Sequence, residues 1–463
     1  MKRDNSRLID HLSAEYAARF PRSRELAVRA ERVMVDGGSH GFRLTRPFPV
    51  RIAGARGAYV HDVDGHALLD FWQGHFANIL GNDPELVTRV LADAFASGVG
   101  LQLGQTEELQ IETAELVCAS LHADKVRFTT SGSLSTMYAI MLARAYTGRD
   151  LVLKVTTGWH GAQPWGLHGV YNRGGEAPWG PESEGLPGDV AGDVVLTRFN
   201  ELEALEQDFR THGDRLACFI VEPHAGAGSF IFAHPEYLRA ARDLCERYGA
   251  LLILDEVISA FRFCAGDLGS LYGIRPDLVT VGKIFGGGMP VAAVAGRDDV
   301  LALCGEAGGN RVAFTGGTYS AHPASLLAAK TMVTYLRDHE AEVYPRLAGT
   351  GDAMRSAIVE GFAAGGVEAC CTGGRGEAGI GGSLTGIHFP HDPAASLDRP
   401  HVLHDPELSD VELSHRILHL ALLLEDVYVL YGCCAASTAH TEADTERLRE
   451  ACAAAGRRVA PYL

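Results

Sequence analysis

The sequence contains no apolar run of about 18 residues, the length that a membrane-spanning helix needs. Its first residues, MKRDNSRLIDHLSAEY, alternate charged and apolar side chains and lack the apolar core of a signal peptide. These absences predict a cytoplasmic protein that has no membrane partner.

An excess of positive charge is also missing. Lys and Arg number 41 against 58 Asp and Glu, which gives a formal net charge of −17. Binding the phosphates of nucleic acid or of an anionic membrane requires clustered positive charge. The composition therefore argues against a nucleic-acid partner.

The ten cysteines lack the spacing of a metal site. They are scattered singly except for the adjacent pairs Cys370–Cys371 and Cys433–Cys434, and no CxxC motif occurs. Adjacent cysteines do not supply the ligand geometry of a zinc site. We predict reduced, mostly buried thiols, no metal and no catalytic cysteine.

Two common nucleotide-binding motifs are absent as well. The nearest approach to GxGxxG is HAGAGSFIF, which lacks the third glycine and a following acidic residue at a strand end. A Walker A loop fails because Lys283 is followed by Ile284 and not by Ser or Thr. A nicotinamide-dependent oxidoreductase and a Walker A nucleotide-binding protein are both disfavoured.

The apolar residues that are present predict an α/β fold. Hydrophobic residues make up 46% of the 463 residues, enough for several cores or for two lobes. Between about residues 110 and 330, helical stretches alternate with the short apolar runs KVRFTT, DLVLKVT, LACFIVEP, ALLILDEV and LVTVGK. Such alternation is typical of a mostly parallel sheet with helices on both faces.

We divide the chain into four segments. Residues 1–38 are predicted to form an N-terminal helical arm, and residues 39–105 begin a small domain with the antiparallel ribbon PVRIAGARGAYVHDVDGHALLDF. Residues 106–335 form the large domain, and residues 336–463 complete the small one. The first and last segments are expected to pack together.

Opposite charges follow two of the apolar runs. Asp255 ends ALLILDEV, and Lys283 ends LVTVGK shortly before three consecutive glycines. The carboxyl ends of parallel strands meet at one rim of a sheet, where ligands bind. The pair could form a buried salt bridge or belong to a cofactor site.

Neighbouring motifs favour the cofactor site. Ser131, Gly132 and Ser133 precede a predicted helix, where free N–H groups suit a phosphate but also an ordinary N-cap. Trp159, in VTTGWHGAQ, lies in a glycine-flanked turn where a planar ligand could stack. A phosphate site, a stacking ring, a carboxylate and a lysine are together what pyridoxal 5'-phosphate (PLP) requires.

The stretches LLILDEVISAFRF and YGIRPDLVTVGKIFGGGMPVAAVAGR resemble the signature of class-III aminotransferases, which are PLP-dependent transferases of fold type I. Within that family the chain is most similar to the glutamate-1-semialdehyde aminomutase group. The similarity continues through VRFTTSGSLSTMYAIMLARAYTGRD, WHG, FIVEPHAGAG and FTGGTYSAHPAS and covers about residues 40 to 450. It implies a large PLP-binding domain and a smaller α+β domain formed by both chain ends.

The resemblance assigns roles to the cofactor-binding residues. It implies that Lys283 is the catalytic Schiff-base lysine and that Asp255 is the partner of the pyridine nitrogen. Ser131, Gly132 and Ser133 would hold the phosphate. Trp159 stands in the place of a stacking tyrosine, and Asn200 matches an asparagine near the oxygen side of the ring.

Further roles concern the substrate and a second subunit. Gly317 and Thr318 match a loop that contacts the phosphate of the other subunit, which implies a homodimer with shared active sites. Arg43 matches an arginine that binds the substrate carboxylate, although an ordinary surface arginine is the alternative. His75 stands where the aminomutases have an active-site tryptophan, so we expect a different substrate shape.

The predicted reaction is transamination between an amino acid and a keto acid. The donor is expected to have one carboxylate and an apolar or aromatic body, β-amino acids included, because VYVLYGCCAAS offers no arginine for a second carboxylate. Aminomutation and epimerisation start with the same lysine and remain alternatives. A catalytically silent binding protein of the same fold is the alternative from another class, suggested by the altered loop SGSLS.

Overall fold

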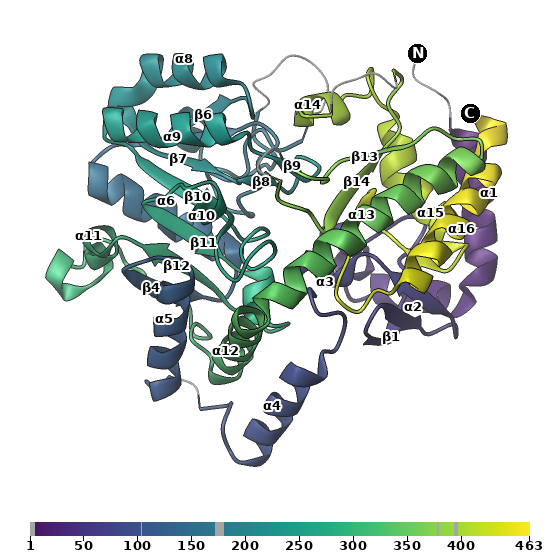
Figure 1. Ribbon diagram of the computed structural model, residues 1–463, viewed down its shortest axis with the longest axis horizontal. Helices are drawn as coiled ribbons and strands as arrows, with labels where there is room; N and C mark the ends of the chain where they lie inside the picture. The colour runs from purple at the N-terminus through teal and green to yellow at the C-terminus, as the bar shows by residue number, and fades with distance from the viewer. Residues whose placement is uncertain (1–4, 103, 172–179, 377–378, 393–396) are drawn as a thin grey trace.

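The computed structural model describes residues 5–102, 104–171, 180–376, 379–392 and 397–463. These residues form a large α/β domain and a small α+β domain, and Figure 1 shows them as two lobes side by side. The helices α12 (Pro323–Asp338) and α13 (Glu340–Ala364) lead from the large domain to the small one. The predicted fold class is confirmed.

A seven-stranded sheet forms the centre of the large domain. Its order is β4 (Lys125–Thr129), β12 (Ala292–Gly296), β11 (Leu278–Val281), β10 (Leu251–Asp255), β7 (Leu216–Val221), β5 (Leu151–Val155) and β6 (Val194–Thr197). β12 is antiparallel to both neighbours, whereas the other strands pair in parallel. Every residue of the five strands between β4 and β6 is buried, as expected for a sheet covered on both faces.

Alternating side chains of β10 anchor helices on the two faces. Leu251 and Ile253 pack in the core that includes α6 (Gly132–Thr147). Leu252 and Leu254 pack in the opposite core, with α9 (Pro235–Tyr248) and α8 (Leu202–His212). This period of two follows from the pleat of a strand. It leaves Asp255 as the last residue of a buried strand at the rim of the sheet.

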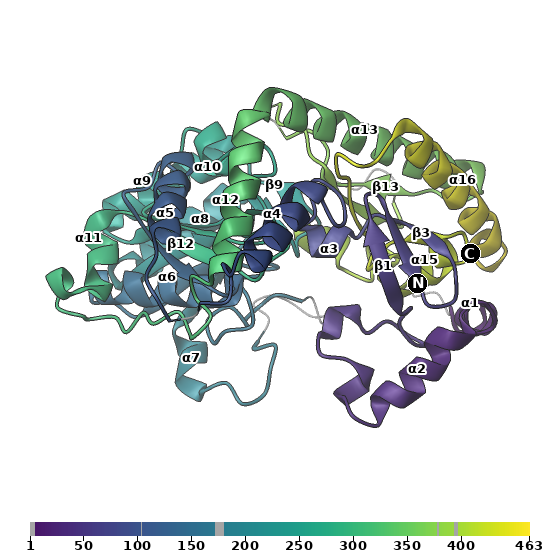
Figure 2. The same cartoon turned by 90° about the horizontal axis from the view of Figure 1, so that it is seen from below.

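One hydrophobic core joins both ends of the chain in the small domain. It contains apolar residues of α1 (Ser6–Arg19), of α13, of α15 (Leu418–Leu423) and of α16 (Glu442–Val459). Figure 2 shows α1, α15 and α16 grouped at one side of the molecule. Arg458 of α16 pairs with Glu15 of α1 and with Glu425.

Two small sheets complete this domain. One has the order β1 (Ile52–Arg56), β2 (Tyr59–Asp62), β3 (Ala67–Asp70) and β15 (Val427–Tyr428), so that a strand from the end of the chain pairs with the predicted N-terminal ribbon. The other has the order β13 (Cys370–Cys371), β14 (Leu384–His388) and β16 (Cys433–Ala435).

The remaining helices and strands of the two domains are α2 (Pro21–Glu31), α3 (Gln73–Phe76), α4 (Glu85–Ala96), α5 (Glu108–Ser120), α7 (Gly188–Gly192), β8 (His224–Ala225), β9 (Ile231–Phe232), α10 (Leu268–Leu271), α11 (Asp298–Leu301) and α14 (Pro400–Leu403).

The structure differs from the sequence-based expectations in two places. The predicted N-terminal arm is two helices divided at Phe20, because Pro21 begins α2 and cannot continue the hydrogen bonds of α1. The alternation of helices and strands also predicts a helix between β10 and β11, but this connection contains only the single α-helical turn α10. There, a Cβ at Gly266 would lie 2.4 Å from the carbonyl oxygen of Ser120, so the connection passes close to the backbone at the end of α5. The proposed domain boundaries remain predictions.

The part of the chain that the structure describes includes no helix both long and apolar enough to cross a bilayer.

Candidate active site

A cavity of about 1,080 Å³ is lined by residues of both domains. The strand ends of the large sheet and the start of α6 line it, as do β14, the π-helix Leu413–Ile417 and α3 of the small domain. Most of the predicted site residues line this cavity, namely Arg43, His75, Ser131, Gly132, Ser133, Trp159, Asp255 and Lys283. The fold therefore brings together side chains that are up to 240 positions apart in the sequence.

Asp255 is held in one orientation at the end of β10. Its side chain is buried, and its Oδ2 lies 2.8 Å from Nδ1 of His160. Its Oδ1 accepts a hydrogen bond from the Thr280 hydroxyl at 3.0 Å and from the Val257 N–H at 3.2 Å. Thr280 is the residue paired with Asp255 on the adjacent strand β11, so the sheet register itself fixes the carboxylate.

Lys283 lies two residues after β11 and has a backbone φ of 47°. This left-handed conformation is uncommon for a residue with a side chain and often marks a functional site. Burial lowers the lysine pKa to about 8, against the opposing effect of the Asp255 and Glu222 carboxylates. A pKa near 8 leaves about a tenth of the amine neutral at pH 7, far more than in an ordinary lysine, and the neutral amine is the form that acts as a nucleophile and as a base.

Glu222 is the third ionisable group near the sheet rim. Its two carboxylate oxygens accept hydrogen bonds from the N–H of Trp159 at 2.9 Å and of Gly226 at 3.0 Å. Burial and the nearby Asp255 carboxylate raise the pKa of Glu222 to about 8. Through these two hydrogen bonds, Glu222 connects the turn that contains Trp159 with the hairpin β8–β9.

The start of α6 and the turn at Gly161 form a small cradle of backbone N–H and hydroxyl groups. Ser131 is the N-cap and accepts a hydrogen bond from the Leu134 N–H, and the first N–H groups of a helix have no partner within the helix. The Ser133 hydroxyl accepts a hydrogen bond from the Ala162 N–H at 3.2 Å. Gly161 has φ +82°, and a Cβ there would lie 2.4 Å from the Ser133 hydroxyl oxygen. Only glycine allows this close approach.

An aromatic cluster lines another part of the cavity. The ring of Phe42 lies 6.2 Å from that of Trp159, 6.3 Å from that of Tyr171 and 5.6 Å from that of Tyr431. Trp159 therefore lies in an aromatic setting that can accommodate a planar ligand.

Arg43 and His75 lie beside this cluster. Arg43 ends the 3-10 helix Gly41–Arg43, lines the cavity and is exposed to solvent. The His75 ring lies 4.6 Å from that of Trp72 and 6.2 Å from that of Phe42. Burial lowers the pKa of His75 to about 3, with smaller contributions from Lys283 and other cationic groups, so its imidazole is neutral.

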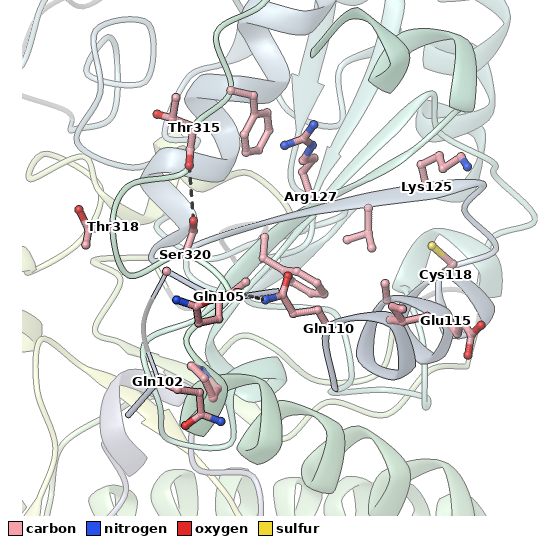
Figure 3. A pocket seen from close by; sticks show the side chains of 18 of the residues that line it. Gln102, Gln105, Gln110, Glu115, Cys118, Lys125, Arg127, Thr315, Thr318 and Ser320 are labelled. Atoms are coloured by element: carbon pink, nitrogen blue, oxygen red, sulfur yellow. Dashed lines mark hydrogen bonds between the residues drawn. The ribbon is translucent and has the colours of Figure 1, made fainter. Parts of the chain in front are cut away.

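Three of the predicted residues do not line the cavity. Asn200 donates from Nδ2 to the Phe232 carbonyl at 3.0 Å and accepts from the His234 N–H at 2.9 Å. Its amide thus binds the backbone at the end of β9 and just before α9, and its contact with the cofactor remains a prediction. Gly317 and Thr318 lie elsewhere: Thr318 lines a separate pocket of about 690 Å³, shown in Figure 3.

Sequence reasoning missed Glu222 and His160, although signals for both were present. Glu222 follows the apolar run LACFIV just as Asp255 ends LLILD, so the same strand-end argument applies to it. His160 directly follows Trp159 in the motif WHG. Both residues lie at the rim that the strand pattern predicts to be the ligand site.

Comparison with known proteins identifies the family. The family model described as Aminotransferase class-III matches residues 43–358. A glutamate-1-semialdehyde 2,1-aminomutase of Thermoplasma acidophilum is 35% identical over 309 residues, which cover 66% of this chain and 72% of that protein.

Two solved structures are similar over nearly the whole length. An omega-transaminase from Sphaerobacter thermophilus has a TM-score of 0.84 and 31% identity, and the match covers 94% of this chain and 97% of that one. A β-phenylalanine aminotransferase from Variovorax paradoxus has a TM-score of 0.81 and 28% identity over 97% of this chain and 96% of that one. The chain belongs to the class-III aminotransferases, a family of PLP-dependent enzymes.

The residues present fit this cofactor. The start of α6 offers N–H groups to a phosphate, and the space that Gly161 leaves open keeps Ser133 accessible beside it. Asp255 offers an oriented carboxylate to a pyridine nitrogen, and Lys283 offers an amine. Trp159 offers a ring at the same cavity.

Proposed function

We propose that this protein is an aminotransferase that transfers the amino group of an amino acid with one carboxylate and an aromatic or apolar body to a keto acid. The observation that carries the proposal is the convergence of Lys283, Asp255 and the start of α6 on one cavity that also contains Arg43 and the aromatic cluster. The cavity thus contains groups for cofactor, carboxylate and apolar body.

The cofactor-binding residues have the following roles. Ser131, Gly132 and Ser133 hold the phosphate of PLP at the start of α6, and Trp159 packs on the ring. Asp255 binds the pyridine nitrogen, oriented by His160 and Thr280. When bound, the cofactor withdraws the electrons left on the substrate carbon after its C–H bond breaks.

Lys283 would hold the cofactor covalently, and once the substrate amine has displaced it, its free amine would move the proton. Its amine, with a pKa of about 8, accepts the proton from the substrate carbon and returns a proton at the end of the half-reaction. The neighbouring Asp255 and Glu222 carboxylates stabilise the protonated amine between these steps.

The substrate is oriented by the groups that lie outside the cofactor cradle. Arg43 binds the carboxylate with its planar guanidinium, and the rings of Phe42, Trp72 and Tyr431 contact the body of the substrate. The relative from Variovorax paradoxus, described as a β-phenylalanine aminotransferase, supports an aromatic β-amino acid as donor. Aminomutation is the second candidate, supported by the 35% identical aminomutase of Thermoplasma acidophilum.

The active enzyme is a homodimer in which Gly317 and Thr318 contact the phosphate of the partner subunit. In support, this loop lies outside the cavity of its own chain, and Figure 3 shows Thr318 at the edge of the second pocket beside Thr315 and Ser320. Tyr319 and Leu101, which a second copy would cover, are 60% and 73% exposed. Light scattering should give twice the mass of the chain.

A panel of amino donors tests the proposed reaction. The holoenzyme is mixed with each donor without an acceptor, and the change in cofactor absorbance is followed. We expect aromatic β-amino acids to react and Arg43→Ala to weaken their apparent affinity about tenfold or more, because the carboxylate loses its charged partner. If only amines without a carboxylate react, or if Arg43→Ala changes nothing, the proposal for the substrate is wrong.

A further inference from the structure

Three histidines that the reaction does not use line the small-domain side of the cavity. His388 ends β14, His404 follows α14, and His415 lies in the π-helix Leu413–Ile417. The ring centres of His388 and His404 are 6.5 Å apart, and those of His404 and His415 are 5.8 Å apart. We call His388, His404 and His415 the histidine wall.

Two members of the wall are fixed by hydroxyl groups. Nε2 of His404 lies 3.0 Å from the Ser229 hydroxyl oxygen. Nε2 of His388 lies 3.3 Å from the Thr372 hydroxyl oxygen, and Thr372 donates to the carbonyl of Ser229. These contacts join β14 to the loop between β8 and β9 and set the orientation of both rings.

His415 is different because its ring is open to the cavity. Within the described part of the chain, neither of its nitrogens has a hydrogen-bond partner. Its ring lies 6.3 Å from that of Tyr431, which in turn lies 5.6 Å from Phe42 in the aromatic cluster. The wall is thus continuous with the rings that contact the substrate body.

The imidazoles of the wall are neutral at neutral pH. Burial lowers the pKa of His404 and of His415 to about 4 and that of His388 well below its usual value. The acidic residues that line the cavity, Glu222 and Asp255, belong to the large domain and do not contribute to these shifts. A neutral imidazole offers one donor and one acceptor and no net charge.

We propose that the histidine wall binds an uncharged hydrogen-bonding group, such as a hydroxyl, at the far end of the substrate, and that His415 is the residue that determines this specificity. The preferred donor is then a hydroxylated aromatic amino acid and not a purely apolar one. This inference rests on the proposed aminotransferase function.

Physical arguments favour a hydroxyl at the histidine wall over an apolar group and over a second carboxylate. A purely apolar end would leave the donor and the acceptor of His415 without partners, and a site built for a hydrogen bond discriminates against ligands that lack one. A second carboxylate would require a cation, but Arg43 and Lys283, the cationic residues that line the described cavity, already bind the first carboxylate and the cofactor. A hydroxyl can donate to the unprotonated nitrogen of His415 or accept from its N–H, whichever nitrogen faces it.

Three matched donors test the inference in half-reactions of the holoenzyme. They are β-phenylalanine and its 4-hydroxyphenyl and 4-carboxyphenyl analogues. We expect the 4-hydroxyphenyl donor to react with about tenfold higher efficiency than β-phenylalanine, the value of one buried hydrogen bond, and the 4-carboxyphenyl donor to be the poorest. A preference for the 4-carboxyphenyl donor, or equal rates for the hydroxylated and unsubstituted donors, would overturn the inference.

Substitutions of His415 test whether this residue determines the preference for the hydroxylated donor. His415→Phe should lower the ratio of the hydroxylated to the unsubstituted donor to about one, whereas His415→Asn, which keeps a donor and an acceptor, should retain part of the preference. His61→Phe, on the exposed face of β2 outside the cavity, is the matched control and should not change the ratio. An unchanged ratio in His415→Phe contradicts the assignment.

Calorimetry makes the test independent of turnover. We expect 3-(4-hydroxyphenyl)propanoate to bind the wild-type holoenzyme about tenfold more tightly than 3-phenylpropanoate, and to lose that advantage in His415→Phe. If the acids bind in this way but no carboxylated donor reacts, the aminotransferase proposal fails while the binding site stands. If the donors react but neither ratio depends on His415, the inference alone fails.

Discussion

The two sides of the cavity are built from different kinds of structure. On the large-domain side, Asp255 and Lys283 follow adjacent parallel strands, and pairing of Asp255 with Thr280 fixes their relative position. On the small-domain side, the histidine wall comes from a strand end, the loop after a one-turn helix and a π-helix. A parallel sheet thus positions the proposed cofactor-binding residues, whereas the histidine wall is assembled from separate elements of the small domain.

The largest effect should come from Lys283→Ala on the large-domain side. The variant loses the amine that binds the cofactor and moves the proton, so amino transfer should fall by about a thousandfold or more. Circular dichroism and thermal unfolding should show an intact fold, because the lost side chain leaves only a small gap at a strand end. Substantial residual amino transfer in a clean preparation would show that another residue carries out these steps.

Asp255→Asn tests the same side without removing the covalent anchor. The variant should still bind PLP but react about a hundredfold or more slowly, because a neutral amide no longer favours a protonated pyridine nitrogen. Absorbance of the holoenzyme measures binding, and half-reaction rates measure the chemistry. Rates close to those of the wild type would contradict the role given to this carboxylate.

Gly161→Ala tests the phosphate cradle. A Cβ at Gly161 would lie 2.4 Å from the Ser133 hydroxyl oxygen, so we expect cofactor affinity to fall about tenfold, measured by titration of cofactor-free protein. Gly185→Ala is the matched control, because Gly185 has a similar φ of +79° but a Cβ there would meet no atom within 4 Å. Equal losses in both variants would mean that backbone strain, and not the cradle, is responsible.

The smallest effect concerns stability and pH. Glu222 has a pKa raised from 4.5 to about 8 in the folded chain, so between these pH values the folded state binds more protons than the unfolded state. Stability of the cofactor-free protein should therefore decrease as pH rises through this window, on account of this group. Urea unfolding of Glu222→Gln at several pH values should give a flatter dependence than the wild type. An unchanged slope would show that Glu222 is ionised throughout.

The contrast between the large-domain side and the small-domain side of the cavity also explains which site residues the sequence predicts. Asp255 and Lys283 could be placed because buried strands are apolar runs, and a charge at the end of such a run marks the sheet rim. Asn200 shows the limit, because its position in the chain does not reveal that its amide binds the backbone of Phe232 and His234.

The histidine wall could not be predicted for a physical reason. His404 lies in the loop after α14 and His415 lies in the helical stretch 411–423, and their approach to His388 depends on how these segments pack in the small domain. The fold class was predictable, since alternating helices and strands have strong patterns, but the contacts between loops depend on tertiary packing.

The shared core of the small domain has a consequence for how the chain is made. Leu8, Leu12 and Tyr16 of α1 pack in the same core as Leu448 and Cys452 of α16. During synthesis on the ribosome, the large-domain strands can pair long before α16 emerges, while the apolar face of α1 stays uncovered. The large-domain side of the cavity can therefore form before the core of the small domain is complete, and the apolar face of α1 is exposed to aggregation during that interval.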